Sequence, residues 1–126
     1  MNKIINQTLN AMRVNGKKIP FAFLYYEGHD DTYITYQQTD ADASLSGDDD
    51  LIGYVDYYDF DIYSKGNYKS IVEQLKTDLK AHGFVWQPSR SSGDMYETDT
   101  KYYHKTLCFA ILRQEEEWPN GKNWSW

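Results

Sequence analysis

The strongest constraint on the fold is one amphipathic pattern in the second half of the chain. Its apolar residues recur at helical spacing, and they are Tyr68, Ile71, Val72, Leu75 and Leu79. The other side of the pattern is polar and includes Lys69, Glu73, Lys76 and Lys80. Gly66-Asn67 before this pattern and His82-Gly83 after it are typical helix-terminating residues. A helix that is apolar on one side must bury that side, so the pattern requires a second layer for it to pack on.

A long alternating segment at 51–63 supplies that layer. It is rich in tyrosine and aspartate, and its even positions become more apolar toward the end. Since alternate residues of a strand point to opposite faces, we predict a strand with Tyr58, Phe60 and Ile62 toward the core.

The remaining elements follow from shorter patterns. Ile5, Leu9 and Met12 predict an N-terminal helix that stops at Asn15-Gly16. Two β-rich segments joined by a Gly/Asp turn predict a hairpin over 21–26 and 32–38. The polar residues 39–50 predict an exposed, mobile loop. Further strands are expected at 84–86, 95–98 and 102–113, the last two joined by a tight turn at 99–101.

These elements together predict an α+β fold, with two helices packed on one mainly antiparallel (mixed) sheet. The length of 126 residues is that of one domain. We expect a single domain over 1–117 and a Trp-rich C-terminal extension over 118–126, which holds three of the four tryptophans.

Charge is divided along the chain. The formal net charge is -6, but no Lys or Arg occurs between Lys18 and Lys65, a stretch that holds eleven of the 19 acidic residues. The rest of the chain has 13 basic residues against the other 8 acidic ones, a balance of +5. An acidic block of -11 disfavours ordinary binding to a phosphate backbone.

No motif predicts catalysis or a cofactor. The segment Asp40–Leu51 starts like a calcium loop but has Leu45 where glycine is required and Leu51 where a bidentate glutamate is required. His104 and Cys108 are about 13 Å apart on an extended strand, too far to share a metal ion. The single cysteine excludes an intrachain disulfide, and no glycine-rich phosphate loop occurs. We therefore expect a non-enzymatic protein with no cofactor and no metal.

The N-terminus has no signal-peptide core, and no apolar run approaches the roughly 20 residues of a membrane span. We expect an intracellular protein with a reduced Cys108 and no membrane partner. The chain has twelve tyrosines, and eight of them lie in the acidic block. This pattern is typical of a protein interface, and equally of an ordinary sheet that is rich in tyrosine.

The order of elements and turns resembles the tail-terminator (tail-completion, head-tail joining) proteins of long-tailed phages and prophages. The matching turns are Gly83-Phe84 at the end of the helix, Tyr96-Glu97-Thr98-Asp99, and Tyr103-His104 at the start of the last strand. The resemblance covers most of residues 1–113 and does not include the Trp-rich tail.

This resemblance implies a structural virion protein that forms a ring, typically of six subunits, on the last ring of the tail tube. Such a ring stops tube polymerisation and offers a joining surface to the neck. Its implied partners are copies of itself, the major tail tube protein and a head-completion protein, while DNA passes through the channel without specific binding. The implied location is the virion neck, after assembly in the host cytoplasm.

Unlike charged patches are a plausible means of matching neighbours in a ring. The residues predicted to take part in interfaces are Asp48, Asp49, Asp50, Tyr57, Asp59, Asp61, Trp118, Trp124 and Trp126. For the three consecutive aspartates, a contact with a ring neighbour or the tail tube, a place in the channel lumen and a merely solvated loop are all open. The alternatives to a tail terminator are an acidic DNA-mimic inhibitor and, behind it, a carbohydrate-binding module.

Overall fold

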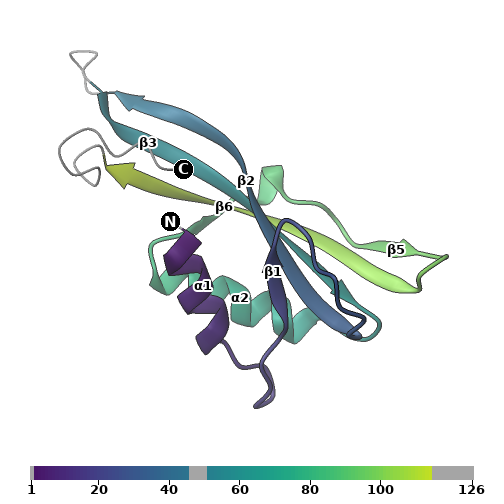
Figure 1. Cartoon of the computed structure of the whole chain (residues 1–126). Coiled ribbons are helices and arrows are strands. Elements are labelled where there is room, and N and C mark those ends of the chain that lie inside the picture. The colour runs from purple at the N-terminus through teal and green to yellow at the C-terminus, as the bar shows by residue number, and fades with distance from the viewer. Residues whose placement is uncertain (1, 46–50, 115–126) are drawn as a thin grey trace.

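In the computed structural model, residues 2–45 and 51–114 are described, and they form one mixed sheet with two helices on one of its faces (Figure 1). The strand order is β1-β2-β3-β6-β4, and β5 pairs with another part of β6. The elements are α1 (Asn2–Ala11), β1 (Phe21–Phe23), β2 (Thr32–Leu45), β3 (Leu51–Ser64), α2 (Lys69–Ala81), β4 (Val85–Trp86), the 3-10 helix η1 (Pro88–Arg90), β5 (Met95–Glu97) and β6 (Tyr102–Gln114). All pairs are antiparallel except β1 with β2, so the predicted α+β class with a mainly antiparallel sheet is confirmed.

The helix predicted from the amphipathic pattern is α2. Its four buried residues are those of the apolar pattern, Ile71, Val72, Leu75 and Leu79. Gly83 has a φ of 90°. The backbone N–H groups of Gly83 and Phe84 donate to the carbonyls of Lys80 and Leu79, the paired bonds of a Schellman C-terminus. His82-Gly83 therefore ends the helix as predicted.

Alternation along β3 divides its side chains between two faces. Tyr58, Phe60 and Ile62 point toward the helices and are buried, as predicted. Phe60 is the centre of the core, with ring centroids 5.6 Å from Phe109 and 5.9 Å from Tyr36. The Tyr36 hydroxyl reaches α1, where it donates a 2.7 Å hydrogen bond to Asn6 Oδ1. We call the side toward the helices the covered face and the other side the open face.

The predicted polar loop at 39–50 is wrong over its first part, because β2 continues to Leu45. β2 contains a bulge: Gln38 pairs with Tyr58 and Asp40 with Tyr57, which leaves Thr39 as an extra residue. After the bulge, Ala41 and Ala43 lie on the covered face and Asp40 and Asp42 on the open face. The partner strand β3 supplies the backbone hydrogen bonds that a solitary polar segment lacks. Residues 46–50 lie outside the described residues.

The predicted hairpin between the first two strands is also wrong, because β1 and β2 pair in parallel, with Phe21 opposite Ile34 and Phe23 opposite Tyr36. β1 ends at Phe23, and the following loop (24–31) returns to the start of β2. Asn15-Gly16 does not cap α1 either, since the helix ends at Ala11. Both residues have positive φ, 53° and 78°, and they form a tight turn closed by reciprocal bonds between Val14 and Lys17.

Candidate protein interface

A stack of aromatic rings lies on the open face, where β2 begins, β3 ends and β6 begins. Tyr26, from the loop after β1, stacks on Tyr33 of β2 with 4.5 Å between ring centroids. Tyr33 stacks on Tyr63 of β3 at 4.8 Å, and Tyr63 stacks on His104 of β6 at 4.2 Å. Tyr102 meets Tyr33 and Tyr63 edge-on and donates a 2.7 Å hydrogen bond to the Asp30 carbonyl. We call these five residues the tyrosine stack.

Burial, followed by the negative charge of Asp61, raises the pKa of Tyr63 to about 12. Burial also raises the pKa of Tyr33. Both phenols are therefore neutral near pH 7. The rings of the stack cover one another, so the broad faces that a sugar would need are occupied along most of it. This geometry disfavours the carbohydrate-binding alternative on this face.

Two of the predicted interface aspartates lie beside the stack and are engaged within the chain. Asp61 Oδ1 accepts hydrogen bonds from the Thr106 hydroxyl and from His104 Nε2, the latter at 2.9 Å. Asp59 lies against Cys108, and burial followed by the charge of Asp61 raises the Asp59 pKa. Burial, together with Asp59, raises the pKa of the Cys108 thiol to about 11. Cys108 is therefore a buried thiol of low reactivity.

The third described residue of the prediction, Tyr57, lies under a basic side chain. The Arg90 guanidinium is carried over the open face by η1, and its Cζ is 3.7 Å from the centroid of the Tyr57 ring. Arg90 Nη1 is 3.4 Å from Asp40 Oδ2. A residue of the basic part of the sequence thus already pairs with the acidic block inside one chain.

A second pairing of this kind is buried on the covered face. Arg113 of β6 makes two hydrogen bonds to the Asp56 carboxylate of β3, at 2.7 and 3.2 Å. Asp56 is 1% exposed and Arg113 7%. The Arg113 guanidinium also lies over Tyr54, 4.6 Å from the ring centroid. Because the pair is buried, it belongs to the interior of this region rather than to a contact surface.

The structure therefore brings Tyr57, Asp59 and Asp61 together on the open face of β3. The other predicted interface residues lie outside the described residues, and they are Asp48, Asp49, Asp50, Trp118, Trp124 and Trp126. The sequence prediction missed two further groups of exposed apolar side chains, which lie at opposite edges of the sheet.

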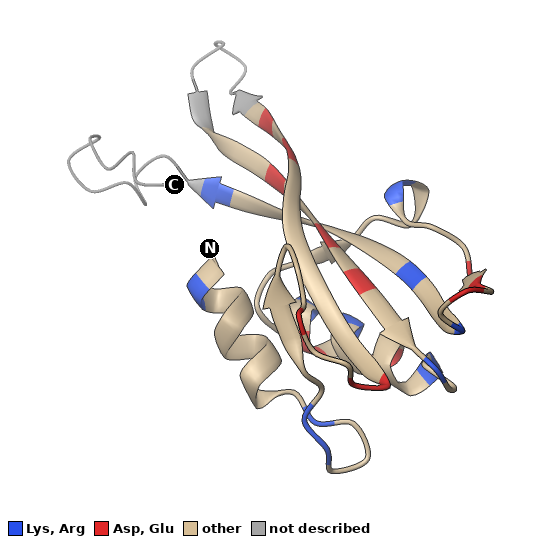
Figure 2. Cartoon of the chain, turned by 45° about the vertical axis from the view of Figure 1, so that its right-hand side comes forward, with Lys and Arg blue, Asp and Glu red and all other residues tan. Residues whose placement is uncertain are grey.

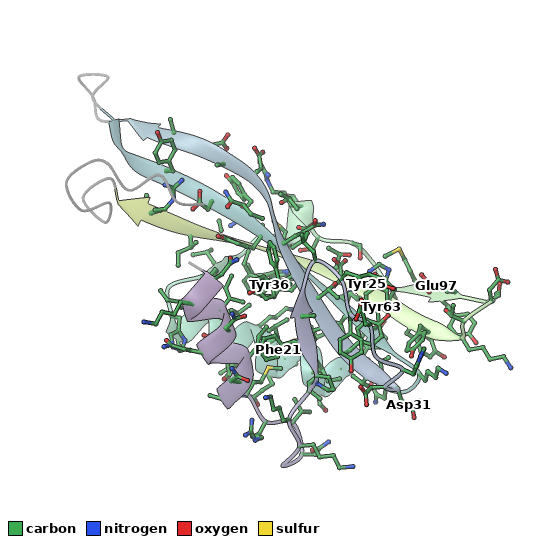
Figure 3. All side chains as sticks on the ribbon, viewed as in Figure 1. Phe21, Tyr25, Asp31, Tyr36, Tyr63 and Glu97 are labelled. Carbon is green, nitrogen blue, oxygen red and sulfur yellow. The ribbon has the colours of Figure 1, made fainter. Side chains whose placement is uncertain are left out.

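The first group is at the β1 edge. It consists of Phe23, the last residue of β1, and of Leu24 and Tyr25 directly after it, and Tyr25 is 72% exposed. Figure 3 labels Tyr25 on the loop that follows β1. Glu27, Asp30 and Asp31 follow in the same loop and are exposed. We call residues 23–31 the β1 corner.

The second group is at the β4 edge, where a pocket of about 350 Å³ opens between α2 and β4. Its lining residues are Lys76, Lys80, Phe84, Val85, Trp86 and Phe109. Lys76 Nζ is 3.7 Å from the centre of the Trp86 ring, and Trp86 Nε1 donates a 3.1 Å hydrogen bond to Ser91 Oγ. We call this the β4 pocket. Its interior is aromatic and its rim is cationic.

The charge distribution differs between these regions. Acidic residues lie on β2, β3 and α2, in the β1 corner and around β5. Lys and Arg lie on α1, in the loop between α1 and β1, in the loops that precede α2 and β6, and on α2, η1 and β6 (Figure 2). The sequence signal for the two edge groups was weak. Phe23, Leu24 and Tyr25 look like part of an ordinary strand, and Val85 and Trp86 like another.

Within residues 2–45 and 51–114, no group of three or more His, Cys, Asp or Glu is placed to hold a metal ion. Over the same residues, no helix has the length and apolar character needed to cross a bilayer. Comparison of the chain with protein-family models and with curated proteins finds no match.

Proposed function

We propose that this protein is a structural subunit that assembles head-to-tail into a closed ring, in the manner of the phage tail-terminator proteins that its sequence resembles. In that role the ring caps the tail tube, ends its polymerisation and presents a joining surface to the neck. The subunit contacts copies of itself, the tail tube protein and a head-completion protein, and DNA passes through the ring.

One observation carries this proposal: the two edges of a single sheet expose unlike surfaces. The β1 corner is apolar and acidic, and the β4 pocket is apolar and basic. A closed ring requires a heterologous contact, in which one patch meets a different patch on the next copy. Exposed apolar groups at strand edges also favour association, because a free edge is a site for intermolecular contact.

The DNA-mimic alternative requires carboxylates that are free and spaced like phosphates. Asp56, Asp59 and Asp61, in the most acidic strand, are each engaged or buried within the chain. These three carboxylates are therefore less available to a DNA-binding protein, whereas other acidic residues of the block, such as Asp30 and Asp31, are exposed.

The test is the native mass of the purified protein, together with negative-stain images over a series of protein concentrations. We expect closed rings of one size. A monomer at every concentration contradicts the proposal, as does an open-ended filament. A monomer that also displaces a nuclease from DNA establishes the mimic instead.

A further inference from the structure

The backbone at the β1 corner is strained. Leu24 has a φ of 68°, in the left-handed region that non-glycine residues rarely adopt. The Tyr25 N–H donates a 2.8 Å hydrogen bond to the Phe23 carbonyl, which closes a three-residue γ-turn around Leu24. The Leu24 N–H is fixed to the Tyr36 carbonyl at 2.9 Å. A γ-turn with positive φ is rare and costs free energy, so something must compensate for it.

Within one chain the strained turn gains little apolar burial. It directs Leu24 and Tyr25 into solvent, where they are 58% and 72% exposed. Adjacent exposed apolar residues on a strained turn are typical of a contact surface, because strained conformations cluster where a molecule binds.

The β4 pocket has complementary chemistry. Its volume of about 350 Å³ is enough to accept apolar side chains, and Phe84, Trp86 and Phe109 supply aromatic walls. Lys80 is exposed at its rim. An apolar pocket with a cationic rim fits a segment in which apolar residues are followed closely by a carboxylate. In the β1 corner Leu24 and Tyr25 are followed two residues later by Glu27.

The corner of a given chain cannot reach its own pocket. β1 and β4 are the two ends of the order β1-β2-β3-β6-β4, four strand spacings apart, or about 19 Å across the sheet. The occupant that matches the pocket is therefore supplied by another copy.

We propose that Leu24 and Tyr25 of one copy insert into the β4 pocket of a second copy, with Glu27 placed against Lys80. This contact rests on the proposed ring and specifies which surfaces form it. Tyr25 is the central anchor, since a buried tyrosine with a hydrophobic neighbour is a common interface hot spot.

Mixed cross-linking tests the contact without reference to ring closure. Glu27→Cys protein is mixed with Lys80→Cys protein under mild oxidation, which leaves Tyr25 in place, and both positions are exposed in one chain. We expect a covalent dimer in the mixture and little in either variant alone. The buried Cys108 contributes little background. Thr100→Cys, on the distant β5–β6 turn, mixed with Lys80→Cys is the matched control and should give no dimer.

Self-association affinity gives a second measurement. Tyr25→Ala should weaken association about 30-fold, the effect of losing a hot spot. Tyr96→Ala, which removes a tyrosine that is 50% exposed on β5, is the matched control and should change little. Glu27→Lys and Lys80→Glu should each weaken association by up to about fivefold, and the double exchange should restore most of the loss.

The outcomes separate this contact from the ring proposal. Closed rings without the cross-link, and unaffected by Tyr25→Ala, overturn the contact and leave the ring. A cross-link in the mixture with dimers or filaments but no closed ring supports the contact and contradicts the ring. A monomer that gives no cross-link overturns both.

Discussion

The two faces of β3 are stabilised in different ways, although their residues alternate along one strand. On the covered face Phe60 is enclosed by Tyr36, Phe84 and Phe109. On the open face Tyr63 is half-buried between Tyr33 and His104, beside a hydrogen-bonded Asp61. The covered face excludes water by packing against helices, whereas the open face obtains order from ring stacking and side-chain hydrogen bonds.

The two faces contribute differently to the free energy of folding. Apolar burial supplies most of the folding free energy, because it scales with the area removed from water. The open face gains less from area, but its stacked rings connect the loop after β1 to β2, β3 and β6. We expect the covered face to determine the stability of the fold and the open face to determine the position of the β1 corner.

The largest effect should come from Phe60→Ala. It removes the ring at the centre of the core and should lower the free energy of unfolding by about 3–5 kcal/mol. Denaturant unfolding at one fixed protein concentration measures this loss, since self-association alters apparent stability. Phe60→Leu is the control and should retain most of the stability. A loss below about 1 kcal/mol for the alanine variant would show that the covered face does not determine the stability of the fold.

The next effect tests the ion pair of Asp56 and Arg113, which is buried in the covered face. Arg113→Met leaves the Asp56 carboxylate buried without its bidentate partner, and should cost about 3 kcal/mol in the same unfolding assay. The double variant Asp56→Leu with Arg113→Met removes both charges and should recover much of that loss. If the double variant is no more stable than the single one, the loss does not come from leaving the Asp56 carboxylate without its partner.

On the open face Tyr63→Ala should cost about 2 kcal/mol, because it interrupts the stack with Tyr33 and His104. Tyr63→Phe keeps the ring and is the matched control. The same variant should also loosen the loop that carries Tyr26, seen as faster amide hydrogen exchange over 24–31. Equal losses for Tyr63→Ala and Phe60→Ala would remove the distinction between the faces.

The smallest effect is pH-dependent. Burial raises the pKa of Asp59 above its usual 3.8. Ionisation of this carboxyl therefore opposes folding once the pH rises above 3.8. Asp59→Asn should therefore raise Tm slightly near neutral pH, and the gain should vanish as the pH falls below 3.8, where the carboxyl is protonated in both states. Asp61→Asn, which weakens bonds to Thr106 and His104, should lower Tm at neutral pH instead. A gain that grows on acidification contradicts the assigned cause.

Periodicity predicted the covered face well. Local spacing predicts the helix α2 and the β5–β6 hairpin. It also predicts that Tyr58, Phe60 and Ile62 point into the core. A strand that is buried on one side carries that information in its own residues.

The rest depended on partners that local patterns do not reveal. Asp40 and Asp42 have low strand propensity, yet β3 lies beside them and completes their backbone hydrogen bonds. The γ-turn at Leu24 has no local sequence signal, so the pattern predicts a hairpin where β1 and β2 pair in parallel. The β4 pocket assembles side chains from α2, β4 and β6, which no single sequence window contains.

The bulge at Thr39 has a consequence for insertions and deletions. Because a strand alternates its faces, loss of one residue between Thr32 and Gln38 would exchange the faces of the side chains beyond it and turn Asp40 and Asp42 inward. Thr39 is the exception. Its neighbours Gln38 and Asp40 already oppose consecutive residues of β3, so its removal would leave an even ladder with each side chain on its present face. The strand can therefore be shortened by one residue at Thr39 at the cost of the bulge and of the Thr39 hydroxyl bond to the Tyr57 carbonyl.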